Sequence, residues 1–167
     1  GHSKPIDMTV GEPGETMPGF VIDRMSEARE LLGKYPLTRG SDDVRKVIGQ
    51  WIERRYGLAG LIDPLKEVII SNGSREGLFY AILPAVGRKQ VAGKPVVLLP
   101  NPYYHAYLGS ALAVNAEAVF LDATEETGHL PDLDALARQP EVLERTVAFY
   151  LCTPANPQGS VAKPDYI

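Results

Sequence analysis

Apolar side chains recur along the first third of the chain at the spacing of a helix. Between residues 41 and 56 they come every three or four positions, which predicts an amphipathic helix. The residues of this pattern are Val44, Val47, Ile48, Trp51 and Ile52. Ser41 suits the N-cap of this helix and Gly57 its end. A broad apolar face predicts an earlier helix from Thr16 to Leu32, preceded by an extended arm with a short strand at Ile6–Val10.

After residue 66, short apolar runs alternate with helical patterns. The runs predict strands at Val68–Ile70, Val96–Leu99, Ala118–Leu121 and Val147–Leu151. Helices are expected between them, at Ser74–Leu83, at His105–Ala113 and after Pro131. Strands joined through helices pair in parallel, and strands that are apolar on both faces need helices on each side. We therefore expect an α/β fold of three layers, with a mostly parallel sheet between helices.

Composition and charge narrow the classes of partner. The chain has 167 residues, 44% of them hydrophobic, and a net charge of −4, which gives no reason to expect nucleic acid or an anionic membrane as a partner. No apolar run approaches the ~20 residues of a membrane span, and the N-terminus has no signal-peptide pattern. The single cysteine, Cys152, excludes an internal disulfide and fits a reducing compartment, so we expect a cytoplasmic protein.

Ligands of parallel sheets bind at the carboxyl ends of the strands, and three predicted strand ends carry unusual residues. The first is the polar turn Ser71-Asn72-Gly73, which opens into a helix near Ser74. The free N–H groups of a first helical turn attract anions, and glycine allows close approach. This turn is therefore a candidate phosphate site. The alternative is an ordinary connection with a serine N-cap.

The other two strand ends carry aromatic rings and a restrained asparagine. Tyr103, Tyr104 and Tyr107 follow the second predicted strand, where one ring could stack on a planar heterocycle or all three could be core aromatics with satisfied hydroxyls. Asn156 lies between two prolines after the last strand. It either offers a donor and an acceptor to a ligand, or belongs to a proline-rich turn.

Several common sites are not indicated by the sequence. The three histidines show no metal-ligand spacing, so no metal site is expected. The chain has neither a Gly-x-Gly-x-x-Gly sequence nor a Walker A lysine motif, and its Gly-Ser pairs lack the frame of a hydrolase nucleophile elbow.

Five segments in order along the chain together resemble the class I/II aminotransferases of pyridoxal-phosphate fold type I. They are Gly11-Glu12-Pro13, Tyr35-Pro36 with Gly40, Ser71 to Gly77, Asn101 to Tyr107, and Pro154 to Gly159. The chain looks most similar to the succinyldiaminopimelate aminotransferase branch of lysine biosynthesis. The resemblance implies residues 1–40 as an N-terminal arm and helix, and residues 41–167 as the first half of a domain that binds pyridoxal 5′-phosphate.

The resemblance also implies roles for individual residues. Gly73, Ser74 and Arg75 would bind the cofactor phosphate, and Tyr104 would stack on its ring, with Tyr107 as the substitute if the register differs. Asn156 would hydrogen-bond the phenolic oxygen of the ring. Gly11 would lie near the substrate carboxylate, and Tyr35 would cross the interface of a homodimer to the partner's phosphate.

The activity implied is transfer of an amino group from a donor such as glutamate to a keto or aldehyde acceptor, for example succinyl-amino-oxopimelate. The Schiff-base lysine, the aspartate that pairs with the ring nitrogen and the arginine that binds the substrate carboxylate are expected beyond Ile167, so the chain is interpreted as an inactive fragment. Two alternatives stay open. One is an aminotransferase-like sensor domain of a transcription regulator, and the other is a phosphate-binding α/β module unrelated to this cofactor.

Overall fold

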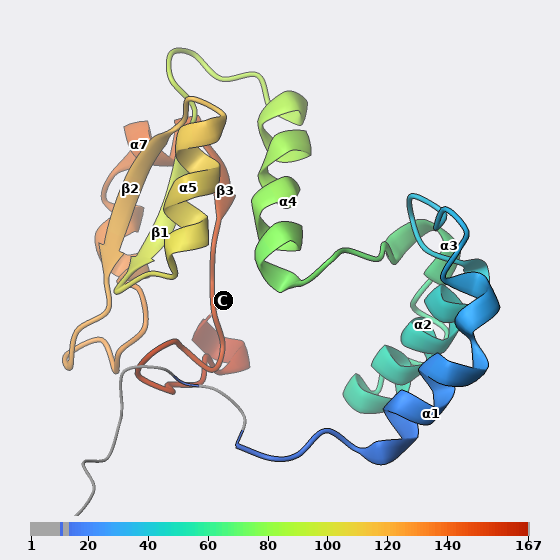
Figure 1. The fold of residues 1–167 in the computed structure, drawn as a ribbon. Helices are drawn as coiled ribbons and strands as arrows, with labels where there is room; N and C mark the ends of the chain where they lie inside the picture. Colours follow the sequence, from blue (N-terminus) through green and yellow to red (C-terminus); the bar gives the residue numbers. More distant parts are fainter. Residues whose placement is uncertain (1–10, 12–13, 167) are drawn as a thin grey trace, which may run out of the picture. The chain divides into compact units, whose positions relative to one another are not determined.

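A computed structural model describes residue 11 and residues 14–166. The expected strand at Ile6–Val10, and Glu12 and Pro13 of the first motif, lie outside the described residues. The chain divides into two compact units, Gly1–Ile70 and Ser71–Ile167, which we call unit 1 and unit 2. In Figure 1, unit 1 runs from blue to green and unit 2 from green to red. None of the described helices is long and apolar enough to cross a membrane.

Unit 2 is built on a parallel sheet of three strands in the order β2-β1-β3. Its elements follow one another as α4 (Ser74–Arg88), β1 (Val96–Asn101), α5 (His105–Ala113), β2 (Glu117–Asp122), α6 (Leu133–Ala137), α7 (Pro140–Arg145), β3 (Thr146–Phe149) and the 3-10 helix η2 (Pro164–Tyr166). Central strand β1 pairs with β2 from Val96↔Glu117 to Asn101↔Asp122. Helices connect the strands (Figure 1), so the expected α/β fold with a parallel sheet is confirmed.

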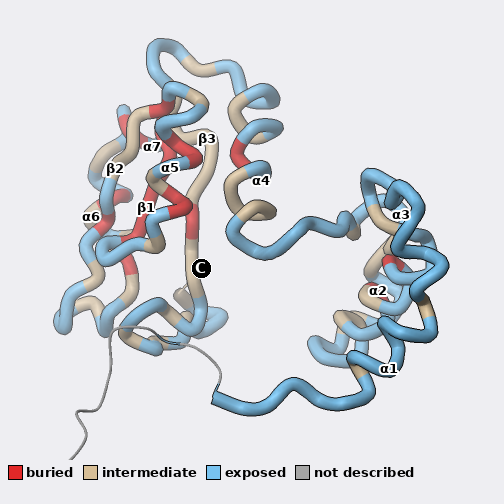
Figure 2. The backbone as a smooth tube through the Cα atoms, in the orientation of Figure 1, coloured by how far each residue is buried: buried red, intermediate tan, exposed pale blue. Residues whose placement is uncertain are grey.

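Strand β1 is buried on both faces, and its alternate residues enter two separate clusters of the core. Val97 and Leu99 pack with Ile82 of α4 and Ala111 of α5. Val96 and Leu98 face the other side, where the cluster is completed by Leu121, Leu136 and Val142 from β2, α6 and α7. Figure 2 shows this burial as red segments concentrated on β1 and α5. The two clusters define the three layers expected from strands that are apolar on both faces.

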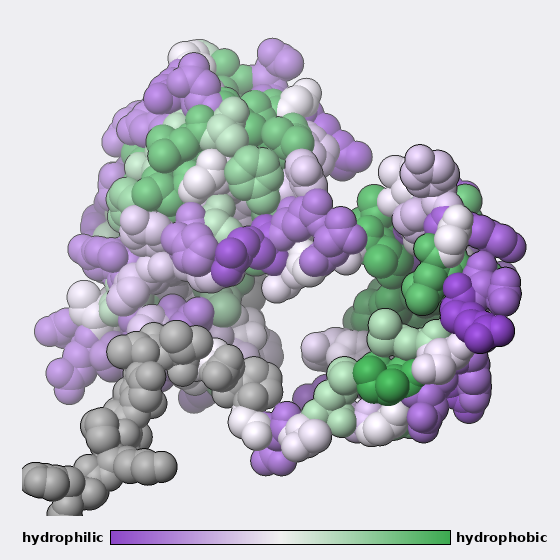
Figure 3. All heavy atoms as spheres, viewed as in Figure 1, coloured by the Kyte–Doolittle hydropathy of each residue, from purple (hydrophilic) through white to green (hydrophobic). Residues whose placement is uncertain are grey.

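Unit 1 is helical: α1 (Gly19–Glu27), the 3-10 helix η1 (Arg29–Leu31), α2 (Asp42–Tyr56) and α3 (Pro64–Glu67). The helix predicted over residues 41–56 is confirmed. The Ser41 hydroxyl accepts from the Val44 N–H at 3.4 Å, and Gly57 ends the helix at φ 68°. The earlier predicted helix is shorter than expected and ends in a 3-10 turn. Many apolar side chains of these helices stay exposed, as the green spheres of Figure 3 show; they include Phe20, Leu32, Val47 and Trp51.

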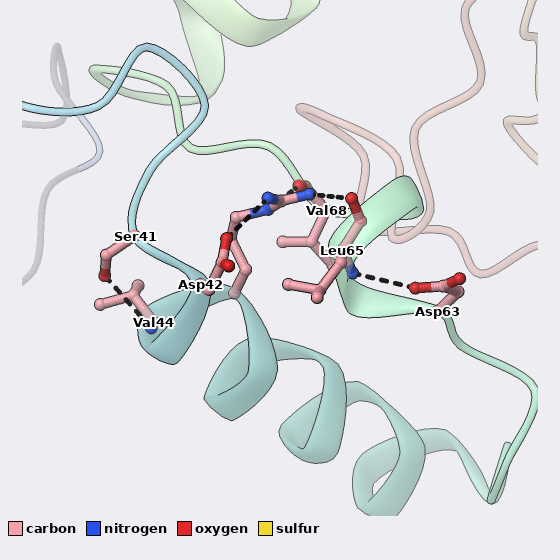
Figure 4. A network of polar contacts seen from close by, with 7 residues as sticks. Ser41, Asp42, Val44, Asp63, Leu65 and Val68 are labelled. Carbon is pink, nitrogen blue, oxygen red and sulfur yellow. Dashed lines mark hydrogen bonds and ion pairs between the residues drawn. The ribbon is translucent and has the colours of Figure 1, made fainter.

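A buried arginine joins the parts of unit 1. Arg45 of α2 is only 2% exposed. Its Nε donates to the carbonyl of Val68 at 2.7 Å, one terminal nitrogen donates to the carbonyl of Leu65, and the other lies 3.4 Å from a carboxylate oxygen of Asp42. Figure 4 shows Leu65 and Val68 presenting these carbonyls toward the helix that carries Asp42. The guanidinium fork thus fixes the segment after α3 against α2.

The strand predicted at Val68–Ile70 is wrong, because these residues adopt no regular secondary structure. Their described contacts are with loops and a side chain: the Ile70 N–H donates to the carbonyl of Arg39 at 3.2 Å, and the Val68 carbonyl accepts from Arg45. A strand requires a neighbouring strand for its ladder, and no described segment of unit 1 supplies one.

Candidate functional site

Three segments of unit 2 meet around the carboxyl end of β1. They are the N-terminus of α4, the loop after β1 and the loop after β3. The Arg75 side chain at the start of α4 hydrogen-bonds Tyr104, which follows β1. Asn156, after β3, lines a cavity together with Pro100 and Pro102 of the β1 end. Figure 1 shows the first turn of α4 and the ends of β1 and β3 on the same side of this unit. The start of α4 thus contacts the loop after β1, and the loop after β3 lines a cavity with the end of β1, but that cavity is lined neither by Tyr104 nor by residues of α4.

The first turn of α4 offers backbone donors. Helix α4 begins at Ser74 after Gly73, whose φ of 135° lies where side chains are rarely tolerated. Among the described residues, no hydrogen bond uses the N–H groups of Gly73, Ser74 or Arg75. A Cβ on Gly73 would meet no atom within 4 Å other than those of its chain neighbours. These three amides and the dipole of a 15-residue helix form an anion-binding arrangement.

The turn before α4 is fixed by its own side chains. The Ser71 hydroxyl donates to the Gly73 carbonyl at 3.1 Å, and a Glu76 carboxylate oxygen accepts from the Asn72 N–H at 2.9 Å. The Gly77 N–H donates to the Gly73 carbonyl and closes the first helical turn. These bonds hold the turn without using the N–H groups of Gly73, Ser74 and Arg75, because their donors are the Ser71 hydroxyl and the N–H groups of Asn72 and Gly77.

Tyr104 is a half-buried ring restrained by three neighbouring side chains. Arg75 Nε donates to its hydroxyl at 2.8 Å. The neighbouring ring of His105 lies 4.5 Å away between centroids, and Tyr107 meets it edge-on at 5.7 Å. The ring is therefore restrained in position beside the α4 terminus, which is the arrangement expected of a stacking platform.

Tyr107 lies in the core instead, 6% exposed. Its ring stacks on Tyr150 at 4.4 Å, and the Tyr150 hydroxyl is 2.8 Å from Ser110 Oγ and donates to the Leu78 carbonyl at 2.7 Å. Burial raises the pKa of Tyr107, and the nearby Cys152 side chain raises this pKa further. Tyr107 thus matches the core-aromatic alternative, so of the two tyrosines that the resemblance named, Tyr104 is the one available to a ligand.

Asn156 sits in a tight loop between Pro154 and Pro157. The loop is closed by backbone bonds from Gly159 N–H to the Ala155 carbonyl at 2.6 Å and from Ala155 N–H to the Ser160 carbonyl at 2.7 Å. Asn156 is exposed and borders a small cavity at the strand ends. Asn156 therefore fits both alternatives: it belongs to a proline-rich turn, and its side-chain amide remains accessible to a ligand.

Two of the expected site residues belong to unit 1. Gly11 and Tyr35 are both exposed, and the roles expected of them stay predictions. The side chain of Arg75 was not singled out from the sequence, where only its backbone amide had a role. The signal available was weak: an arginine at the second position of a helix, next to a glycine-rich turn.

The chain is similar to a known family of proteins. A family model described as aminotransferase class I and II matches residues 3–167. The LL-diaminopimelate aminotransferase of Syntrophobacter fumaroxidans is 31% identical over 163 residues, which are 96% of this chain and 40% of that protein. The LL-diaminopimelate aminotransferase of Halothermothrix orenii is 29% identical over 163 residues, again 96% and 40%. The chain thus spans about 40% of the length of the curated relatives it matches.

Solved structures of related proteins agree with the fold. An aminotransferase of Neisseria meningitidis Z2491 superimposes with a TM-score of 0.85 at 32% identity, over 98% of this chain and 40% of that one. The N-succinyldiaminopimelate aminotransferase of Mycobacterium tuberculosis gives a TM-score of 0.77 at 28% identity, over 94% and 39% of the two chains.

Proposed function

Because the chain belongs to the class I and II aminotransferase family, we propose that the full-length protein transfers amino groups with pyridoxal 5′-phosphate as its cofactor. The donor is an amino acid such as glutamate, and the acceptor is a keto or aldehyde compound. The observation that carries this proposal is the unused set of amides at Gly73, Ser74 and Arg75 beside the ring of Tyr104. A phosphate and a planar ring joined by a short link fit these two features together.

The chemistry of these residues supports the cofactor assignment. The three amides and the Ser74 hydroxyl bind the phosphate, since they supply donors without a competing partner. Tyr104 positions the ring, and the Asn156 side-chain amide donates to the ring oxygen. When bound, pyridoxal phosphate supplies the electron sink that stabilises negative charge on the substrate carbon. Gly11 is proposed to lie near the substrate carboxylate.

The acceptor is proposed from the relatives. Both the LL-diaminopimelate and the N-succinyldiaminopimelate aminotransferases are named for diaminopimelate or its succinyl derivative. We therefore propose an acceptor of this chemical class, a dicarboxylate with a keto or aldehyde group such as succinyl-amino-oxopimelate, in amino-acid biosynthesis.

Assembly and location complete the proposal. A homodimer is supported by the apolar residues exposed on the helices of unit 1 and by Tyr35, whose side chain is wholly exposed. Such surfaces are normally covered in an assembly. The cytoplasm is proposed as the compartment, because the single cysteine fits a reducing environment.

The test uses the full-length protein. Purified protein is titrated with pyridoxal phosphate, the bound cofactor is followed by its visible absorbance, and glutamate-dependent amination is measured with succinyl-amino-oxopimelate and with simple keto acids. Ser74→Ala is expected to weaken cofactor binding about tenfold, from the loss of one hydrogen bond to a charged group, while the exposed Ser26→Ala leaves binding unchanged. Binding without turnover on any acceptor would support the sensor-domain alternative, and no binding would refute the proposal.

A further inference from the structure

The side chain of Arg75 has a contact that its backbone role does not explain. Its Nε donates to the Tyr104 hydroxyl at 2.8 Å, across 29 positions of sequence. The guanidinium carbon is 5.9 Å from the centre of the ring, which is the outer limit of a cation–π contact. The interaction is therefore mainly a charge-assisted hydrogen bond to the hydroxyl, and it does not cover a face of the ring by close stacking.

The contact joins two parts of the site that are otherwise on different elements. The amide of Arg75 belongs to the first turn of α4, where it is one of the unused donors. Tyr104 is the residue before α5, and its ring is also restrained by His105 and Tyr107. Arg75 thus belongs to the first turn of α4 through its main chain and contacts Tyr104 through its side chain.

We propose that Arg75 is a positioning residue, which fixes the Tyr104 ring relative to the phosphate-binding turn through its hydrogen bond to the Tyr104 hydroxyl. This inference rests on the proposed function and deepens it. The distance between phosphate and ring is set by the cofactor's covalent structure, so a site that binds both must keep its turn and its platform at a matching separation. Without the bond, Tyr104 keeps its aromatic neighbours but loses its hydrogen bond to α4.

A double-mutant cycle in the full-length protein tests this role. Arg75→Met removes the donor but keeps the backbone amide, Tyr104→Phe removes the hydroxyl but keeps the ring, and the third variant combines both changes. The dissociation constant for pyridoxal phosphate is measured by titration of the apoprotein. We expect about a fivefold loss in each single variant and nearly the same loss in the double variant, because both changes break one hydrogen bond. Losses that multiply in the double variant would overturn the proposal.

Two controls separate positioning from charge and from folding. Arg88→Met removes the same charge from the exposed far end of α4, and we expect binding within twofold of the wild type. Inorganic phosphate, which can bind the turn but has no ring for Tyr104, is titrated in parallel. A side chain that positions the ring leaves the binding of inorganic phosphate unchanged, whereas an equal loss for inorganic phosphate would show that Arg75 acts on the phosphate by charge and would refute the positioning role.

The outcome is distinguishable from failure of the proposed function. If the wild-type protein does not bind pyridoxal phosphate, the proposed function fails and the positioning role fails with it. If the wild type binds it and Tyr104→Phe binds equally well, only the positioning role is wrong. Thermal unfolding of each variant without cofactor checks folding, and Arg75→Lys, which keeps charge and donor, is expected to recover part of the lost affinity. Should Arg75→Met unfold, the Tyr104→Phe and Arg75→Lys variants decide the question by themselves.

Discussion

At the scale of single residues, Gly73 has an unusual backbone conformation although there is room for a side chain beside it. Its φ of 135° and ψ of 161° lie in a region that is essentially restricted to glycine. No atom would lie within 4 Å of an added Cβ, so neighbouring groups do not explain why glycine stands there. The conformation itself is the reason, because residues with a side chain rarely adopt this φ and ψ.

We predict that Gly73→Ala destabilises the full-length protein by about 1–3 kcal/mol, since the alanine must be strained or the turn must change shape. The free energy of unfolding is measured by denaturant titration. The matched control is Gly87→Ala, an exposed glycine inside the same helix with no atom near its Cβ position. There alanine is expected to stabilise by about 0.5–1 kcal/mol. Equal effects at the two positions would mean that Gly73 is not a constrained turn residue.

In unit 1, Arg45 is a charged residue whose side chain is buried. A buried charge is costly unless every donor is used, and here its partners are two carbonyls and a carboxylate. We predict that Arg45→Met loosens unit 1 by about 2–4 kcal/mol, because the carbonyls of Leu65 and Val68 lose their partner. Hydrogen exchange of the α2 amides measures this effect.

The control for Arg45 is Arg55→Met, which removes an exposed arginine from the same helix. Its exchange rates should match those of the wild type. Arg45→Lys should recover little, since a single ammonium cannot reach the positions of the guanidinium fork. Unaltered exchange in Arg45→Met would show that the network adds nothing to stability.

At the scale of elements, an ion pair connects the end of α7 to the start of β2. Arg145 donates to a Glu117 carboxylate oxygen at 2.6 Å and to the Lys94 carbonyl at 3.0 Å, just before β1. The hydrogen bond from Arg145 lowers the pKa of Glu117 below its usual value. The folded protein therefore releases this proton more readily than the unfolded chain does.

The sign of the pH dependence follows from that lowered pKa. The stabilisation is present above the ordinary glutamate value of about 4.5 and is lost as the pH falls through the lower folded pKa. We predict that Glu117→Gln lowers the melting temperature at neutral pH but that the two curves converge in acid. Thermal unfolding across pH measures this, with the exposed Glu144→Gln as control. A constant difference at every pH would contradict the assignment.

Elements with a strong local pattern could be predicted from sequence. The helix expected at His105–Ala113 has those bounds in the structure. The strand expected at Val96–Leu99 begins at Val96 and is two residues longer, ending at Asn101. The apolar run at Val68–Ile70 failed because a run of three residues does not reveal whether a partner strand exists. The six-residue helix α7 was missed because so short a helix is stabilised by the sheet beneath it.

The candidate site could be predicted only in part for a similar reason. The sequence predicted a site for a phosphate and a ring from residue types that suit these groups: glycine, serine, tyrosine and asparagine. The bond between Arg75 and Tyr104 was not readable, because it depends on how α4 packs beside the end of β1. The same holds for Arg45, whose burial depends on carbonyls 20 and 23 positions away.

At the scale of the whole molecule, the chain matches about 40% of its relatives' length, and β2 and β3 are the outer strands of its described sheet. We predict that the 167-residue chain by itself binds pyridoxal phosphate weakly and does not transfer amino groups, because the reaction needs a lysine and no described lysine lines the cavity at the strand ends. The measurement is borohydride reduction with the cofactor, followed by peptide mapping. One lysine labelled stoichiometrically, together with glutamate-dependent turnover, would contradict this interpretation.

During synthesis on the ribosome, strands β1 and β2 are made well before β3. Val96 of β1 and its partner Thr146 of β3 are 50 positions apart, which at ~5–20 residues per second amounts to about 3–10 s of synthesis. During that interval one side of β1 has unpaired N–H and C=O groups, and the helices α6 and α7 that cover its second face are still being made. The nascent protein therefore presents a bare, apolar strand edge for seconds, and this is when it is most exposed to wrong pairing with other chains.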